Sequence, residues 1–327
     1  MTTFSYFESP EFLIYSSHAL VAIEIPIHLF GAYCILTKTP NKMKPVKMCI
    51  STLFFFGAFL DFTLTCLLIP YLTVPALGGI AFGLLQYFGV SNPIQTWFGV
   101  TNFGVTACSI LLCFENRYDS LIVKNHLKTR SYCIKRYIYL SLNFLIALLF
   151  FIPAVYNTPD QVLAKEYVRK IVPNIPSYII DDPEFYVIGP DTQTTVICVA
   201  AMIIFQFFQD LFFVVKLFHY FLTQNGMSKQ TKQLQKMFFL SMELQIFIPV
   251  GILLIPAFYV VYSIANNYHN QALNNIITLI IAIHGVISTI VMIAIHKSYR
   301  MVLLKFISPK TFNRVELPKL KTVLGTF

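Results

Sequence analysis

Seven long apolar stretches constrain the fold that this chain can adopt. A helix needs about 20 predominantly apolar residues to cross the hydrocarbon core of a bilayer. The segments of about that length or longer are 13–36, 47–70, 95–114, 137–155, 194–221, 237–264 and 272–295. Only 12% of the 327 residues are charged, against about 25% in ordinary soluble domains. The sequence therefore predicts a single membrane domain, residues 1–327, built as an all-α bundle of seven transmembrane helices.

An eighth apolar segment, residues 76–90, is too short to span a bilayer. It contains Gly78 and Gly79, and Pro93 lies just beyond it. Glycine and proline both weaken a helix. We expect a loop or a re-entrant segment here, because an additional span would also reverse the orientation of every later loop.

The basic residues indicate which way the helices run. Of the 24 Lys and Arg residues, 21 lie in or beside the loops after spans one, three and five and in the tail, residues 296–327. The chain before Lys38 contains none. Because cytoplasmic loops carry an excess of Lys and Arg, we expect the N-terminus outside and the C-terminus in the cytoplasm. Membrane lipid, and no nucleic acid, is then the expected partner of the net charge of +9.

Ionisable side chains lie inside the predicted spans. The acids there are Glu24, Asp61, Asp210 and Glu243. An acid that faces lipid near a helix centre costs roughly 2.5 to 3.5 kcal/mol, so these side chains should face the bundle. Glu24, Asp61 and His284 lie at a similar depth, and His28 follows Glu24 by one turn. We predict an interior polar network of these four residues, which is either a switch or a static contact between helices.

Span five carries a candidate ligand pocket. Gln206 and Asp210 lie one helical turn apart among several phenylalanines. A small-molecule site needs an apolar cleft with a few polar groups. The alternative is that this phenylalanine-rich face contacts lipid or packs in the core.

Span six carries a candidate hinge, Pro249 and Pro256. Each proline removes a backbone donor from the helix and permits a kink. A static bend is the alternative.

Longer segments of the sequence resemble one family. They are PEFL at 10–13, IPIHLFGAYCILTKTP at 25–40, FENRY at 114–118 and HGVISTIVMIAIHKSYR at 284–300. In this order they resemble the nematode serpentine receptors of class H, which are seven-transmembrane chemoreceptors. The resemblance implies a G-protein-coupled receptor in the plasma membrane of a chemosensory neuron. Such a receptor detects a small-molecule environmental or pheromone-like cue and signals to a heterotrimeric G protein.

The segment Glu115, Asn116, Arg117 and Tyr118, at the end of span three, is the candidate site of activation and G-protein coupling. It is similar to the acidic-Arg-Tyr motif of rhodopsin-like receptors, in which nearby acids hold the Arg until activation. Here Asn116 separates the acid from the Arg, which departs from that motif. A basic residue that snorkels at a helix end is the alternative.

Other classes of membrane protein fit the sequence less well. A metal-dependent membrane enzyme needs histidines clustered at ligand spacing, and no two of the seven histidines are four residues apart. We therefore expect no enzyme activity, no metal and no cofactor. The alternative function is a ligand-gated ion channel or transporter of the chemosensory membrane. A secondary transporter, however, should show repeats and broken helices in two halves, which an odd number of spans does not favour.

Overall fold

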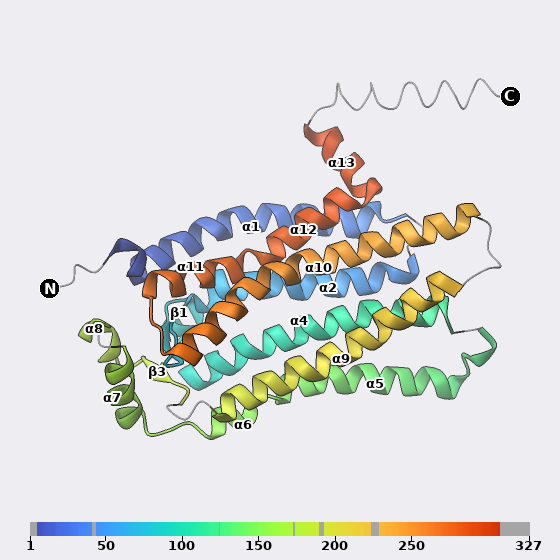
Figure 1. Ribbon diagram of the computed structural model, residues 1–327. Coiled ribbons are helices and arrows are strands. Elements are labelled where there is room, and N and C mark those ends of the chain that lie inside the picture. The colour runs from blue at the N-terminus through green and yellow to red at the C-terminus, as the bar shows by residue number, and fades with distance from the viewer. Residues whose placement is uncertain are drawn as a thin grey trace.

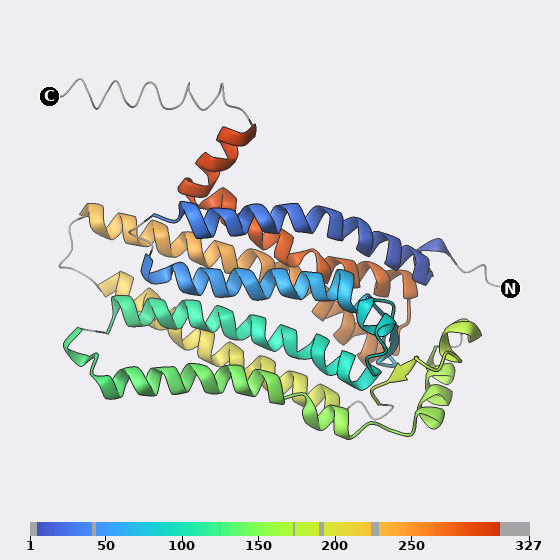
Figure 2. The same cartoon turned by 180° about the vertical axis from the view of Figure 1, so that it is seen from behind.

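Long helices lie side by side in an elongated bundle, and a small sheet covers one end of it (Figure 1). This computed structural model describes residues 5–40, 44–123, 125–172, 174–189, 193–223 and 229–307. The first described residues lie at the end with the sheet, which we call the sheet end. Helix α13 (Lys297–Ile307) projects from the other end, which we call the α13 end (Figure 2).

Seven helical segments in the described ranges form the bundle. Six of them are apolar over a length that can cross a membrane, and the described part of the remaining one contributes a shorter apolar stretch, Val250–Asn266. The segments are α1 (Pro10–Lys38), α2 (Lys44–Phe62) with the π-helix η3 (Thr63–Leu68), α4 (Asn92–Leu121), α5 (Arg130–Leu149) with α6 (Ile152–Tyr156), α9 (Gln193–Thr223), α10 (Lys229–Asn266), and α11 (Gln271–Ala282) with α12 (His284–Ile295). The predicted class, a seven-helix membrane bundle, is confirmed.

Side-chain caps explain where several of these helices begin. Ser9 Oγ accepts a hydrogen bond from the backbone N–H of Phe12 at the start of α1, at 3.1 Å. Asn270 Oδ1 accepts one from Leu273 N at the start of α11, at 3.0 Å. Such caps satisfy N–H groups that the first turn of a helix leaves without a partner. Pro10 fits the first position of α1 because its missing N–H would have had no partner there.

Several helix ends differ from the predicted spans, among them the start of α5 at Arg130 and the start of α10 at Lys229. Helix α4 continues to Leu121 instead of ending near residue 114. Charges end an apolar stretch in the sequence, but they do not interrupt the backbone hydrogen bonds of a helix. The second span ends at Leu68, and Pro70 already belongs to strand β1 (Pro70–Thr73).

The segment predicted as a loop, residues 76–90, contains strand β2 (Gly78–Ala81) and the short helix α3 (Leu84–Tyr87). In the antiparallel pair β1–β2, Pro70 lies opposite Ala81. Strand β3 (Tyr186–Val187) adds to β2, with Val187 opposite Gly78. The all-α prediction missed this small sheet because β3 comes from a loop far along the chain.

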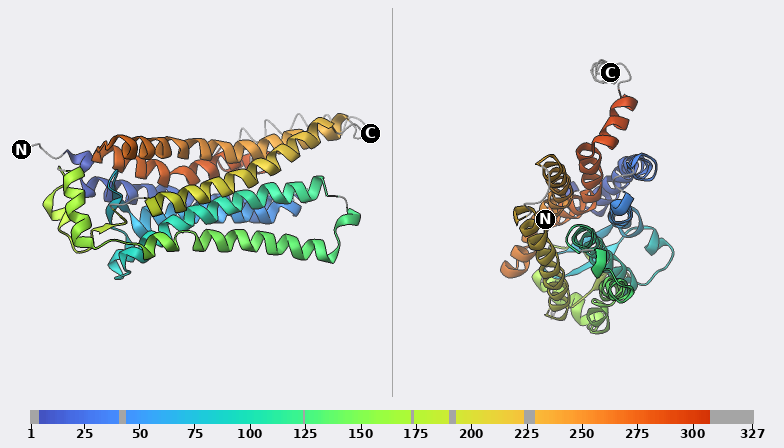
Figure 3. Two further views of the ribbon diagram at one scale, coloured as in Figure 1. Left: turned by 60° about the horizontal axis from the view of Figure 1, so that its bottom comes forward. Right: turned by 90° about the vertical axis from the view of Figure 1, so that its right-hand side faces the viewer.

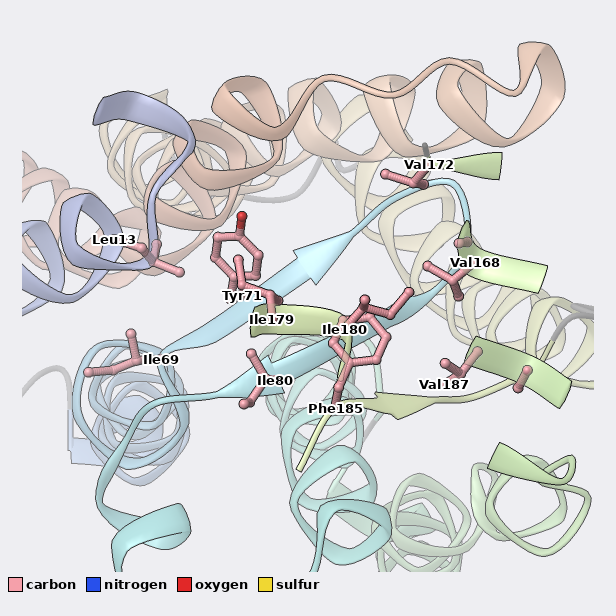
Figure 4. Packing of buried hydrophobic residues seen from close by; sticks show 12 residues of the cluster. Leu13, Ile69, Tyr71, Ile80, Val168, Val172, Ile179, Ile180, Phe185 and Val187 are labelled. Atoms are coloured by element: carbon pink, nitrogen blue, oxygen red, sulfur yellow. The ribbon is translucent and has the colours of Figure 1, made fainter. Parts of the chain in front are cut away.

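One face of the sheet packs against a cap made of α7 (Gln161–Ile171) and α8 (Ser177–Ile180). Tyr71, Phe185 and Val187 are at most 1% exposed on this face. They belong to the same buried cluster as Val168 of α7 and Ile180 of α8 (Figure 4). Burying an apolar side chain of this size stabilises a fold by about 1.5 to 3 kcal/mol. Sheet and cap therefore form one packed unit at the sheet end.

At the opposite end, α13 leaves the bundle beside α1 and α12 (Figure 3). Tyr299 in its first turn is fully buried. The Tyr299 hydroxyl lies 2.8 Å from Thr39 Oγ1, at the end of α1. This contact fixes the base of α13 to the bundle. Two short 3₁₀ helices, η1 (Tyr6–Glu8) and η4 (Asn125–Leu127), complete the described elements.

Gly83→Ala is expected to lower the thermal stability of the purified protein, because a Cβ at position 83 would collide with the backbone carbonyl oxygen of Leu67. We expect a loss of about 1 to 3 kcal/mol, the usual cost of overpacking. The matched control is Gly57→Ala, since a Cβ at position 57 meets no atom within 4 Å. Thermal unfolding in detergent compares the two variants. Equal melting temperatures for both would contradict the packing of β2 and α3 against η3.

Candidate functional site

A cavity of about 310 Å³ lies between the sheet and the bundle. Its walls come from the three strands, from η3, and from α4, α9 and α11. Sites for small molecules are mostly apolar hollows of about 300 to 1,000 Å³. The cavity is therefore large enough for a compact ligand.

The sheet separates this cavity from the packed cap. Tyr186 and the following Ile188 line the cavity, whereas Phe185 and Val187 are buried against the cap. Successive side chains of a strand point to opposite faces of its sheet. The same few residues thus form both the cavity wall and the core behind it.

Polar side chains from the start of α11 hold the β1–β2 hairpin in place. His269 Nδ1 lies 2.8 Å from the carbonyl oxygen of Val74, and Gln271 Nε2 donates to the carbonyl oxygen of Leu72 at 3.1 Å. Leu72 and Val74 both line the cavity. Burial lowers the pKa of His269, although the hydrogen bond to Val74 and the charge of Glu8 oppose this shift.

In the middle of the bundle, a buried carboxylate joins three helices. Asp61 of α2 is fully buried. Its Oδ2 lies 3.3 Å from His28 Nε2 on α1, and its Oδ1 lies 2.9 Å from His284 Nδ1 on α12. Oδ1 also accepts a hydrogen bond from the backbone N–H of Gly285, at 3.0 Å. A Cβ at position 285 would collide with this carboxylate, so glycine is what permits the close approach.

Glu24 joins the same group through Thr65 in the π-helix. The Thr65 hydroxyl lies 2.8 Å from Glu24 Oε2, and Glu24 is 2% exposed. On the other side of the group, His28 Nδ1 lies 3.1 Å from Thr289 Oγ1. The structure thus brings the four residues of the predicted network together. No group of three or more His, Cys, Asp or Glu in the described ranges is arranged to hold a metal ion.

Near the α13 end, Glu115 forms an ion pair with a residue that the sequence did not suggest. Arg136 of α5 donates from Nε and Nη2 to the two carboxylate oxygens of Glu115, each at 2.7 Å. Arg136 Nη2 also lies 3.2 Å from Asn116 Oδ1. Asp119, one turn along α4, accepts from Lys128 Nζ at 2.9 Å. Bidentate pairs of this kind are among the stronger charged contacts in proteins.

Arg117 does not share this cluster with Glu115, because residues two apart point to roughly opposite sides of a helix. It lies on the side of His296, which follows α12. Burial lowers the pKa of His296 to about 4, and the positive charge of Arg117 contributes to the shift. Tyr118 packs edge-on against Phe213 of α9, with ring centroids 5.4 Å apart. Glu115 and Asn116 therefore both contact Arg136, whereas Arg117 and Tyr118 have other neighbours, and Glu115 pairs with Arg136 rather than with Arg117.

Gln206 and Asp210 lie away from the cavity at the sheet end. Gln206 is 5% exposed, its Nε2 donates to the carbonyl oxygen of Ala107 at 3.3 Å, and its Oε1 lies 3.7 Å from Cys108 Sγ. Asp210 follows one turn along α9. Gln206 thus packs between helices, and neither residue lines the cavity at the sheet end. A ligand pocket at Gln206 and Asp210 stays a prediction.

The two prolines of the candidate hinge lie in α10, which runs as one continuous helix from Lys229 to Asn266. Pro256 is buried. The side chain of Pro249 lies outside the described residues. Their role as a hinge stays a prediction.

Arg136 and the strands of the cavity wall are the candidate functional residues that sequence reasoning missed. A signal for the first was present: the acids at 115 and 119 are one turn apart, as are Tyr132 and Arg136. Tyr132 OH indeed donates to Asp119 Oδ1, at 2.9 Å. Two helices joined by a short loop run antiparallel, so these two pairs could have been expected to meet.

Arg136→Ala should destabilise the protein by about 3 to 5 kcal/mol, because it leaves the buried Glu115 carboxylate without its cation. The side chain of Glu115 is only 5% exposed. Adding Glu115→Gln should recover part of the loss. Arg130→Ala, at an exposed position on the same helix, is the control and should change stability by no more than about 0.5 kcal/mol. Thermal unfolding compares the wild type, both single variants of the pair, their double variant and Arg130→Ala, and a strictly additive double variant would argue against the pair.

Stability should also depend on pH through His269. Its pKa is lower in the folded protein than in the unfolded chain, so the unfolded chain takes up the proton first. The contribution of His269 to the free energy of unfolding is therefore complete above the unfolded pKa of about 6.5. It is lost as pH falls below that value. His269→Asn, which keeps a donor for Val74, should show a smaller fall in melting temperature between about pH 7.5 and 5.5. His18→Asn, at an exposed position, should keep the wild-type fall, and an unchanged fall in His269→Asn would contradict the assignment.

Comparison with known proteins agrees with this architecture. The model of the family described as "Serpentine type 7TM GPCR chemoreceptor Srh" matches residues 8–309. Serpentine receptor class H-72 of Caenorhabditis elegans is 26% identical over 318 residues, which cover 96% of this chain and 90% of that receptor. No solved structure matches the chain significantly. The chain therefore belongs to the Srh family of serpentine seven-transmembrane chemoreceptors.

Proposed function

We propose that this chain is a chemosensory receptor that couples a small-molecule environmental or pheromone-like cue to a heterotrimeric G protein. We place it in the plasma membrane of a chemosensory neuron. The observation that carries the proposal is that one helix, α4, contributes both to the cavity and to the charged cluster at the α13 end. Family membership supports a receptor role.

The geometry of α4 supports communication between these two places. Gln95, Gly99 and Phe103 line the cavity, and Glu115 pairs with Arg136 farther along the helix. Between Phe103 and Glu115 the helix rises by about 18 Å. A shift of α4 at the cavity therefore reaches the charged cluster as a movement of one rigid element.

The buried Asp61 group lies between the two places on a second element. Leu64, three residues after Asp61 and within η3, lines the cavity. A ligand that displaces η3 would change the distances from Asp61 to His28 and His284. We propose that this group is the switch, with two hydrogen-bond arrangements that the ligand biases.

The positive-inside rule supports the proposed orientation. The loops and tail near the α13 end carry most of the Lys and Arg residues, which favours the cytoplasmic side for that end. The sheet end would then face outward, where a cue arrives. Arg117, Glu115 and Arg136 would lie within reach of a G protein.

Arg117→Ala should abolish signalling without loss of protein from the cell surface. The measurement is calcium imaging of heterologous cells that express the chain with a promiscuous G protein, challenged with odorant and pheromone-like panels. We expect the response to an active compound to fall at least about tenfold, a coupling loss of about 1.4 kcal/mol. Arg130→Ala, exposed on α5, should respond as the wild type does.

A response that survives Arg117→Ala, and that appears as ion flux in membrane patches without G protein, would contradict the proposal. It would assign the chain to ligand-gated channels instead.

A further inference from the structure

The described lining of the cavity carries no charged side chain. Its polar side chains are Asn92, Gln95, Thr96, Tyr186, Thr195 and Thr278, and the rest of the wall is apolar or glycine. An ion placed here would lose its hydration and gain no partner of opposite charge, which is strongly unfavourable. The cavity is therefore suited to a neutral molecule.

Two polar atoms of the lining residues have no hydrogen-bond partner among the described residues, Oε1 of Gln95 and the hydroxyl of Tyr186. Gln95 is 2% exposed, and its Oε1 is buried and unpaired. Its Nε2 donates to the carbonyl oxygen of Val90 at 2.6 Å and to Gln86 Oε1 at 2.7 Å. Turning the amide over would place Oε1 against the carbonyl oxygen of Val90. These two contacts therefore fix Oε1 as the acceptor that stays open.

An open buried acceptor calls for a donor. Leaving such a group unsatisfied costs about 1 to 3 kcal/mol, which a ligand that supplies an O–H or N–H recovers on binding. An amine would be charged at neutral pH, and an amide would bury a carbonyl group as well. A hydroxyl supplies the donor at the lowest cost in desolvation.

The volume sets the size of the molecule. The cavity measures about 310 Å³, which is at the lower end of the range of small-molecule sites. The expected ligand is therefore compact.

We propose that the cavity binds a neutral, compact and mainly apolar alcohol or phenol, whose hydroxyl donates a hydrogen bond to Oε1 of Gln95. This inference rests on the proposed function, since it names the class of cue that the receptor detects. Gln95 orients the ligand, and the apolar wall supplies most of the affinity.

The test uses the full-length receptor, purified in lipid nanodiscs without a G protein. Thermal unfolding is followed with a panel of compact aliphatic and aromatic alcohols and phenols, such as phenylethanol. Each is compared with its methyl ether and with the matching carboxylate and ammonium compounds. Because a bound ligand raises the melting temperature, the best alcohols should do so at concentrations at least about tenfold lower than their ethers. The charged analogues should have no effect.

Two pairs of proteins locate the binding. Gln95→Leu should reduce the preference for alcohol over ether to less than about twofold. Val199→Phe, at a position that lines the cavity, should remove the shift for the whole panel. Val196→Phe on the same helix, where the side chain is 44% exposed, should keep the shift and thereby controls for the added ring.

Three results would overturn the inference. They are a panel in which no alcohol stabilises the wild type, charged analogues that stabilise it equally well, and a Val199→Phe receptor that keeps the shift. A different result would contradict only the proposed function. In that case alcohols stabilise the purified receptor, but cells that express it give no response that depends on G protein. Conversely, signalling evoked only by acids or amines would leave the receptor role standing and refute the ligand class.

Discussion

The carboxylate of Asp61 is the interaction on which the arrangement of the helices depends. An ionisable group without solvent contact inside a membrane bundle needs polar partners, and here they come from α1 and α12. The side chains of His28 and His284 and the backbone N–H of Gly285 all contact this carboxylate. It also fixes the depth at which α1, α2 and α12 pack, and with it the position of η3, which leads into the sheet.

From that point, the two ends of the bundle differ in chemistry. The cavity at the sheet end is mostly apolar, and hydrogen bonds from the start of α11 hold the hairpin beside it. Toward the α13 end, acids of α4 are paired with Arg136 of α5 and with Lys128, which precedes α5. A neutral ligand and a charged protein partner would each meet a surface of matching character. Helix α4 runs between them without interruption.

Much of this could be predicted from the sequence, because the membrane imposes a simple rule on helix length and on buried charge. The spans followed from apolar stretches, and the grouping of Glu24, Asp61 and His284 followed from their similar depth. Pairings between distant segments could not be predicted in this way. Strand β3 has only two residues, too few for a recognisable pattern, and its partner β2 lies about 100 residues earlier. The cavity depends on that pairing, and for this reason nothing in the sequence marked Gln95 as a lining residue.

The alternation of side chains across β3 has a consequence for how such receptors diversify. Tyr186 and Ile188 face the cavity, whereas Phe185 and Val187 belong to the core behind it. A substitution at an even-numbered position reshapes the wall, while its odd-numbered neighbours keep the cap in place. Under the proposed function, selectivity and structural integrity thus depend on interleaved positions of one short segment. Single substitutions in such a receptor could then change its ligand preference without first requiring a more stable fold.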